Sequence, residues 1–241
     1  MIARPGGPSS STTGATPSVT STTYAAPVHA PGDDHPGFAV IDVETTGFSP
    51  EVERIIEVGV VVLDPLGEET GWFCSLVDPG RDPGPTSVHR ITTEMVHGAP
   101  AFASLHPYLA DLLSSRVVVG HNVDRFDLPF LRAECGRLGR ATVPGVLATV
   151  DTLAVAQQHL GLRGKARLVD CCAHYGLVWD DHHTALGDAR VTAALFRAMR
   201  HQLGDAALAI GALLDRAGGT SWPGRSPSAP RTRRRAGVLT G

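Results

Sequence analysis

The sequence predicts an α/β protein in which helices pack on the faces of a layered β-sheet. Three short runs rich in apolar and β-branched residues come first, within residues 38–77. From residue 102 onward the apolar residues repeat with the period of a helix, and two further apolar runs interrupt the helical stretches. Three sequential strands followed by alternating strands and helices indicate a sheet covered by helices.

The three opening runs each end at residues that favour turns. Residues 38–43 run into Thr-Thr-Gly at 45–47, and residues 55–63 stop at the Asp-Pro-Leu-Gly segment 64–67. Residues 71–77 form the third run and precede a loop rich in Pro and Gly. We therefore expect three strands at these positions.

Two more strands and several helices are expected in the rest of the chain. Phe102, Leu105 and Leu109 lie on one face of a helix, as do Leu112 and Leu113. The expected strands are 117–119 and 147–150, and the expected helices are 102–113, 126–138, 152–159, 167–175, 186–202 and 206–214. No internal repeat is visible.

The two ends of the chain have the composition of disordered segments. In residues 1–36, 21 residues are Ser, Thr, Pro or Gly, and in residues 217–241 this group supplies 14 of 25. Such segments bury too little apolar surface to offset the entropy lost on ordering. We predict two disordered tails around one compact domain at 37–203, with a further helix within 204–216.

Charge is distributed unevenly along the chain. The formal net charge of -3 shows no basic excess of the kind that duplex-binding proteins carry. However, residues 37–216 hold 22 acidic and 15 basic side chains, whereas the tail 217–241 holds five arginines and no acid. The arginine-rich tail could add salt-sensitive affinity for nucleic acid, or act only as a solubility tail. The acidity of the body needs its own explanation.

Cysteine usage and the N-terminal sequence favour a cytoplasmic protein. Cys171 and Cys172 are adjacent, and none of the four cysteines belongs to a C-x-x-C pair, so neither a disulfide framework nor a zinc site is indicated. The N-terminus lacks the apolar region of a signal peptide. No apolar stretch approaches the ~20 residues that span a bilayer. We expect no membrane association.

The first group of acids lies at the end of the first strand. Asp42 and Glu44 are two residues apart, so their side chains point to the same face of the strand. An apolar strand runs directly into these acids, where burial should continue. Burying two like charges together is unfavourable unless a cation is present.

Two further groups of polar residues follow later in the chain. Gly120 to Asn122 interrupt the fourth strand, and Asp127 lies in the first turns of the next helix. Taken alone, Asp124 or Asp127 is equally well explained as an acid that stabilises a helix start. His183 and Asp188 flank the start of the last long helix. Taken alone, His183 is better explained as a polar surface residue.

Together the three groups resemble the DEDD exonuclease family in its histidine variant, DEDDh, the DnaQ-like group related to the proofreading subunit of bacterial replicative polymerases. The resemblance covers about residues 37–203. It rests on Phe38-Ala-Val-Ile-Asp42-Val-Glu44-Thr-Thr-Gly47, His121-Asn-Val-Asp-Arg-Phe-Asp127-Leu-Pro-Phe-Leu and His183-Thr-Ala-Leu-Gly-Asp188-Ala. The family implies a ribonuclease H-like three-layer fold with a mixed five-stranded sheet and helices on both faces.

One spacing departs from the common pattern of that family. Three residues rather than two separate His121-Asn122 from Phe126-Asp127, as in the animal three-prime repair exonucleases. We assign Asp127 as the ligand, with Asp124 as second choice. Thr184, four residues before Asp188, disfavours the tyrosine variant of the family.

The resemblance implies a catalytic site with two divalent cations. Oxygen-only ligands select Mg²⁺ or Mn²⁺, and His183 would be the general base. The resemblance implies that Asp42, Glu44, Asp127 and Asp188 bind the metal ions and, with His183, form the catalytic residues. The implied substrate-binding residues are Thr45, Thr46, Gly47, His89 and Asn122. Candidate phosphate contacts are Arg125, Arg163, Lys165 and Arg167.

The resemblance predicts a metal-dependent 3′-to-5′ exonuclease. It would release 5′-mononucleotides from the 3′ ends of single-stranded DNA, in replication proofreading or repair, and a DNA polymerase is a candidate partner. One alternative is an exoribonuclease that trims RNA 3′ ends, because the motifs do not register the 2′-hydroxyl. Another is a polymerase-associated proofreading subunit that acts mainly by binding. The sequence leaves the oligomeric state open.

Overall fold

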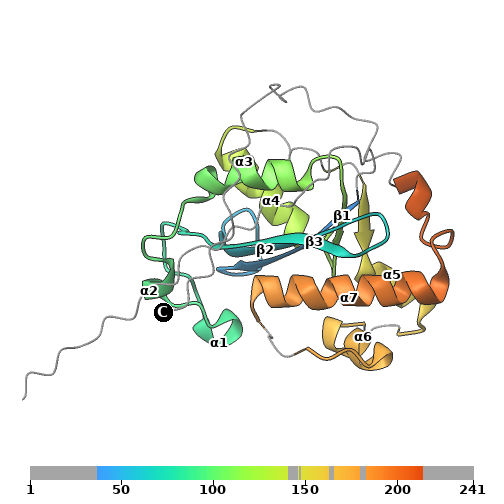
Figure 1. Ribbon diagram of the computed structural model, residues 1–241. Helices are drawn as coiled ribbons and strands as arrows, with labels where there is room; N and C mark the ends of the chain where they lie inside the picture. Colours follow the sequence, from blue (N-terminus) through green and yellow to red (C-terminus); the bar gives the residue numbers. More distant parts are fainter. Residues whose placement is uncertain (1–36, 141–145, 147, 163–165, 180–182, 214–241) are drawn as a thin grey trace, which may run out of the picture.

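The computed structural model describes residues 37–140, 146, 148–162, 166–179 and 183–213, so both predicted tails lie outside the described residues. Five strands form one sheet in the order β3-β2-β1-β4-β5 (Figure 1). β1 pairs antiparallel with β2 and parallel with β4, which confirms the predicted mixed five-stranded sheet. The strands are β1 (Phe38–Thr45), β2 (Ile55–Leu63), β3 (Glu69–Leu76), β4 (Val117–Gly120) and β5 (Thr149–Asp151).

Helices cover both faces of this sheet (Figure 1). Residues 39, 41 and 43 of β1 pack in the core formed with α3 (Phe102–Leu113) and α4 (Asp127–Arg137), whereas residues 38 and 40 pack in the core formed with α7 (Ala185–Leu203). The alternation of side chains along a strand therefore directs Asp42 and Glu44 to the α7 face. Two further helices are α5 (Thr152–His159) and α6 (Leu168–Tyr175).

Most elements occupy the predicted positions, and the differences have local causes. β1 continues through Asp42 and Glu44 to Thr45 because its pairing with β2 continues there. Two four-residue helices, α1 (Thr86–His89) and α2 (Thr93–Val96), were not predicted. The predicted helix 206–214 is wrong at its start: residues 205–209 form turns, and Ala209 has a positive φ of 52° that interrupts a helix. Residues 210–213 are helical.

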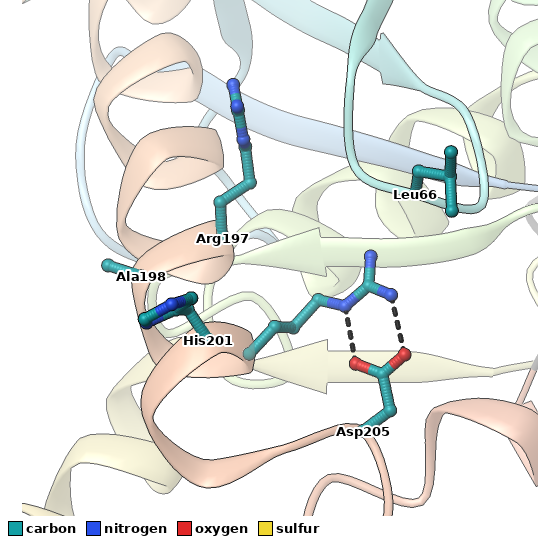
Figure 2. A pocket seen from close by; sticks show the side chains of 6 residues that line it. Leu66, Arg197, Ala198, His201 and Asp205 are labelled. Carbon is teal, nitrogen blue, oxygen red and sulfur yellow. Dashed lines mark hydrogen bonds and ion pairs between the residues drawn. The ribbon is translucent and has the colours of Figure 1, made fainter.

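Helix α7 spans the sheet and is anchored at its C-terminal end. Phe196 contacts Phe38 of β1 edge to face, with ring centroids 4.9 Å apart. Figure 2 shows Arg197 and His201 on α7, Asp205 just after the helix, and Leu66 in the turn between β2 and β3. Arg200 of α7 pairs with Asp205 at 2.7 Å, and the same guanidinium donates a hydrogen bond of 3.1 Å to the Pro65 carbonyl. Arg200 thus fastens the end of α7 to the turn between β2 and β3. None of the described helices is long and apolar enough to cross a membrane.

Candidate functional site

Three of the predicted ligands come together where β1 meets α7. Asp42 and Glu44 lie on the α7 face of β1, and Asp188 lies in the first turn of α7. One carboxylate oxygen from each lies within 4.8 Å of the others. The site therefore forms because two acids in consecutive same-face positions of a strand meet the start of a helix packed on that face.

The three carboxyl groups repel one another in a partly desolvated place. Burial raises the pKa of Asp42 well above its usual value, and the charges of Asp127 and Asp188 raise it further. The pKa of Glu44 is raised to about 7, mainly by burial and further by the charges of Asp188 and Glu57. A divalent cation would remove this repulsion, and three oxygen donors at such spacing suit a hard cation. The residues present therefore fit the implied metal.

Asp127 lies near these three acids but does not belong to the group whose carboxylate oxygens lie within 4.8 Å of one another. It is the first residue of α4 and is buried, and its Oδ1 accepts a hydrogen bond of 3.1 Å from the Val43 N–H. That N–H is available because β1 pairs with β4 only as far as Val40. Burial raises the pKa of Asp127 to about 8. Asp124, the second choice, is exposed to solvent.

His183 stands at the entrance to α7. It precedes Thr184, whose side chain accepts a hydrogen bond of 3.1 Å from the Gly187 N–H and so caps the helix. His183 is exposed and has a positive φ of 65°, a conformation that non-glycine residues adopt mainly in tight turns. His183 therefore lies in a turn directly before the helix that carries Asp188.

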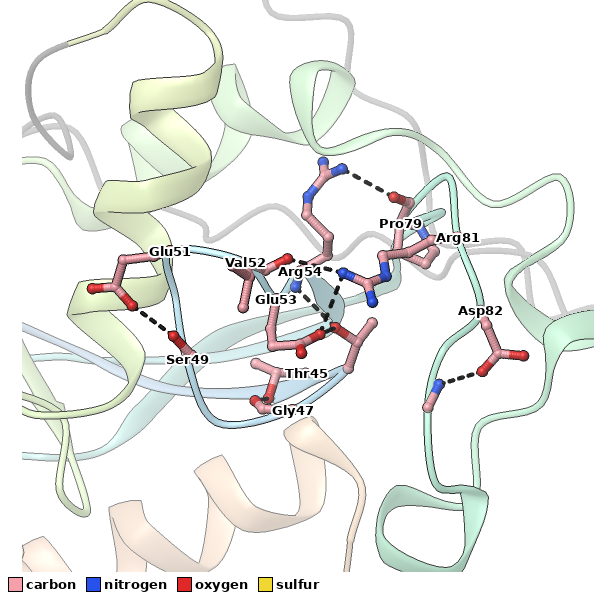
Figure 3. Close-up of polar contacts among 12 residues, drawn as sticks. Thr45, Gly47, Ser49, Glu51, Val52, Glu53, Arg54, Pro79, Arg81 and Asp82 are labelled. Carbon is pink, nitrogen blue, oxygen red and sulfur yellow. Dashed lines mark hydrogen bonds and ion pairs between the residues drawn. The ribbon is translucent and has the colours of Figure 1, made fainter.

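The predicted nucleotide cradle, residues 45–47, lies at the start of the turn 46–54 between β1 and β2, as Figure 3 shows. The Thr45 hydroxyl donates a hydrogen bond of 2.6 Å to the Gly47 carbonyl. The Thr46 hydroxyl donates to Glu53 and accepts a hydrogen bond of 3.0 Å from the Arg54 N–H. Both hydroxyls thus hold the turn itself.

Arginines fasten this turn to neighbouring segments. Arg54 pairs with the buried Glu134 of α4 at 2.7 Å and donates to the Pro79 carbonyl at 3.0 Å. Arg81 donates to the Val52 carbonyl at 2.9 Å (Figure 3). The turn is therefore held against both α4 and the segment that leads into α1, which carries His89.

The other residues predicted to contact the substrate differ in exposure and in their hydrogen-bond partners. His89 is buried, its Nδ1 accepts a hydrogen bond of 3.1 Å from the Ile91 N–H, and burial lowers its pKa. Asn122 has a positive φ of 72° and donates its N–H to Asp151 at 2.8 Å. Arg125 is exposed, and Arg167 pairs with Asp170 at 2.8 Å. Arg163 and Lys165 lie outside the described residues.

Two residues at the site were not predicted. Trp179 donates its indole N–H to Asp188 Oδ1 at 3.1 Å. Glu57 of β2 lies directly opposite Glu44 in the strand pairing and accepts a hydrogen bond of 2.9 Å from the Ala185 N–H. An acid inside the apolar run of β2 was a usable signal for Glu57. No comparable signal marks Trp179, because its contact is made by a loop.

The raised pKa values predict how the stability of the metal-free protein depends on pH. Between about pH 4 and pH 8 the folded protein holds protons on Glu44 and Asp127 that the unfolded chain has released, so stability should fall as the pH rises. Asp42→Asn removes one of the repelling charges and should raise the melting temperature at pH 8 in EDTA, by roughly 2–4 °C for each kcal/mol of repulsion relieved.

Thermal unfolding followed by circular dichroism at pH 5 and pH 8 measures this effect. Asp111→Asn, a neutralisation of an exposed acid on α3, is the matched control and should leave the melting temperature unchanged. An Asp42→Asn variant that melts below the wild type at pH 8 would contradict the expectation.

Comparison with known proteins places the chain among nucleases. The sequence model of a family described as exonuclease matches residues 39–196. DNA polymerase III subunit epsilon of Treponema pallidum (strain Nichols) is 35% identical over 170 residues, which cover 69% of this chain and 77% of that protein. DNA polymerase III PolC-type of Clostridium perfringens (strain 13 / Type A) is 32% identical over 162 residues, but the chain covers only 11% of that protein.

The fold is also similar to that of solved nucleases. E. coli exonuclease I in complex with a dT13 oligonucleotide matches with a TM-score of 0.62 at 19% identity, over 70% of this chain and 42% of that chain. This similarity supports the predicted ribonuclease H-like three-layer fold. The family match covers most of the described domain, from β1 into α7. The chain therefore belongs to this exonuclease family.

Proposed function

We propose that this exonuclease works with divalent cations and removes 5′-mononucleotides from the 3′ ends of single-stranded DNA, in replication proofreading or repair. The observation that carries the proposal is the meeting of Asp42, Glu44 and Asp188 within 4.8 Å. The relative from Treponema pallidum is a subunit of a DNA polymerase, and the similar exonuclease I was solved with a DNA oligonucleotide. Both favour DNA as the substrate and a DNA polymerase as a partner.

Asp42, Glu44 and Asp188 would hold the cations, with Asp127 beside them. We expect Mg²⁺ or Mn²⁺, and two ions, because four carboxylates carry more negative charge than one divalent ion neutralises. When bound, divalent cations in such sites stabilise the charge on the phosphate and make water a stronger nucleophile.

The remaining predicted side chains would bind the 3′ end of the DNA and transfer a proton. His183 would take the proton from the attacking water, because a neutral imidazole nitrogen can act as a general base. The turn at 45–47, together with His89, would receive the terminal nucleotide. Asn122, which follows β4, would face the same 3′ end of the DNA.

A digestion assay with end-labelled oligonucleotides tests the substrate and the direction. Single-stranded DNA and RNA of one sequence, labelled at the 5′ end, are incubated with the full chain and Mg²⁺ or Mn²⁺. We expect the DNA to shorten in steps of one nucleotide, faster than the RNA, with release of 5′-mononucleotides. A DNA circle, which has no 3′ end, is the matched control and should stay intact.

Other outcomes of this assay would revise the proposal. Faster digestion of the RNA would favour the exoribonuclease alternative. Early release of the 5′-labelled nucleotide, or cleavage of the circle, would contradict the direction. No digestion of either linear strand would refute the activity.

A further inference from the structure

We propose that Glu57 is a positioning residue that fixes the start of α7, and thereby sets Asp188 against Asp42 and Glu44. The proposal rests on the function proposed above, because it concerns the same site. It assigns a role to an acid that lies near the predicted ligands. Among the described residues, the acids whose oxygens lie within 4.8 Å of one another are Asp42, Glu44 and Asp188, and Glu57 is not one of them.

The strand pairing places Glu57 on the face of the sheet that α7 covers. In the register of β1 and β2, Glu57 lies opposite Glu44, and Gly59 lies opposite Asp42. Directly opposed residues of an antiparallel pair project on the same side. Glu57 and Gly59 therefore form the surface on which the start of α7 rests, beside the two acids of β1.

Two independent contacts join this surface to Ala185, the first residue of α7. Glu57 Oε2 accepts a hydrogen bond of 2.9 Å from the Ala185 N–H, a backbone donor for which the helix itself supplies no acceptor. A Cβ atom added to Gly59 would collide with the carbonyl group of Ala185, so only glycine allows this close approach. A carboxylate also interacts favourably with the positive end of the helix dipole.

The orientation of the Glu57 carboxylate favours positioning over metal binding. Its Oε2 accepts from Ala185, and its Oε1 accepts from the Cys74 thiol of β3 at 3.5 Å. One carboxylate oxygen thus contacts α7, and the other contacts the neighbouring strand β3. Asp188 lies three residues after Ala185, about one helical turn away, so movement of the first turn moves Asp188 directly.

Fixing the first turn matters because the far end of α7 is already held. Arg200 binds Asp205 and the Pro65 carbonyl there. Without the contact at Ala185, the helix would remain attached at its C-terminal end while its first turn moved relative to β1. A displacement of about 1 Å in a catalytic group can cost on the order of 10²-fold in rate.

Two conservative variants separate the effect of side-chain length, which the hydrogen bond to Ala185 requires, from the effect of charge. Glu57→Gln keeps the length of the side chain and an oxygen that accepts from Ala185, but removes the charge. Glu57→Asp keeps the charge but is one methylene shorter. We expect the Gln variant to stay within a few-fold of the wild type. The Asp variant should lose about 10–100-fold in kcat and in Mn²⁺ affinity, the range found for residues that orient metal ligands, with little change in KM.

Three measurements on the full chain report the result. Turnover of single-stranded DNA gives kcat and KM, electron paramagnetic resonance gives Mn²⁺ binding, and hydrogen exchange by NMR gives the protection of the Ala185 amide, which should fall only in the Asp variant. Glu68→Ala, which removes the ion pair of 2.9 Å with Arg197 further along α7, is the matched control and should change none of these.

Opposite outcomes would overturn the proposal. A Gln variant as impaired as the Asp variant would show that the charge matters rather than the hydrogen bond. An Asp variant with wild-type Mn²⁺ affinity and Ala185 protection would remove Glu57 from this role. Amide exchange and Mn²⁺ binding do not require turnover, so an inactive wild type would refute the proposed function while the proposal on Glu57 could still be judged.

Discussion

Replacing Asp42 by alanine is expected to lower the rate of mononucleotide release about 10³-fold or more. Asp42 interacts with every other acid of the site: its pKa is raised first by burial and then by the charges of Asp127, Asp188 and Glu44. Its loss should weaken cation binding, and the several kcal/mol of charge stabilisation that cations supply correspond to this factor at about 1.4 kcal/mol for each tenfold. Initial rates on 5′-labelled single-stranded DNA measure the change.

A nearby acid outside the cluster provides the control. Glu51 lies in the turn between β1 and β2, is exposed and accepts a hydrogen bond from the Ser49 hydroxyl at 2.7 Å. Glu51→Ala removes the same charge and should leave the rate unchanged. An Asp42→Ala variant that keeps a tenth or more of the wild-type rate would rule out Asp42 as an essential ligand.

Replacing His183 by alanine should lower kcat by about 10²–10⁴-fold, the range over which a general base contributes. Cation binding should persist, because the Trp179 indole and the start of α7 hold Asp188 in place. The single-turnover rate and Mn²⁺ binding, measured on the same preparation, separate the two effects.

The matched control for this prediction lies on the same helix. His201→Ala changes an exposed histidine in the last turn of α7 and should have no effect on turnover. Unchanged turnover in His183→Ala would remove His183 from the mechanism. Loss of Mn²⁺ binding in that variant would mean that His183 supports the cluster instead.

The sheet and its principal acids could be predicted because their signals are local. Runs of β-branched residues mark β1 and β2, and the spacing of Asp42 and Glu44 by two residues puts them on one face of any strand. The three motifs resembled one family strongly enough to predict the five-stranded mixed sheet, which the structure confirms.

Contacts between distant segments could not be predicted in this way. The hydrogen bond from Ala185 to Glu57 joins residues 128 positions apart, and the bond from Val43 to Asp127 joins residues 84 apart. Such contacts depend on strand register and on how closely a helix approaches the sheet, which sequence periodicity does not encode. The wrong helix start before residue 210 has a similar origin, because a single backbone angle at Ala209 interrupts a run of good helix formers.

The dependence of the reaction on divalent cations tests most directly whether the carboxylates at the meeting of β1 and α7 drive catalysis. The rate of mononucleotide release from single-stranded DNA is measured with Mg²⁺, after chelation with EDTA, and again after excess Mg²⁺ is restored. We predict that EDTA abolishes release and that Mg²⁺ restores it in the wild type. Release that continues at an undiminished rate in EDTA would contradict a cation-dependent site at this cluster.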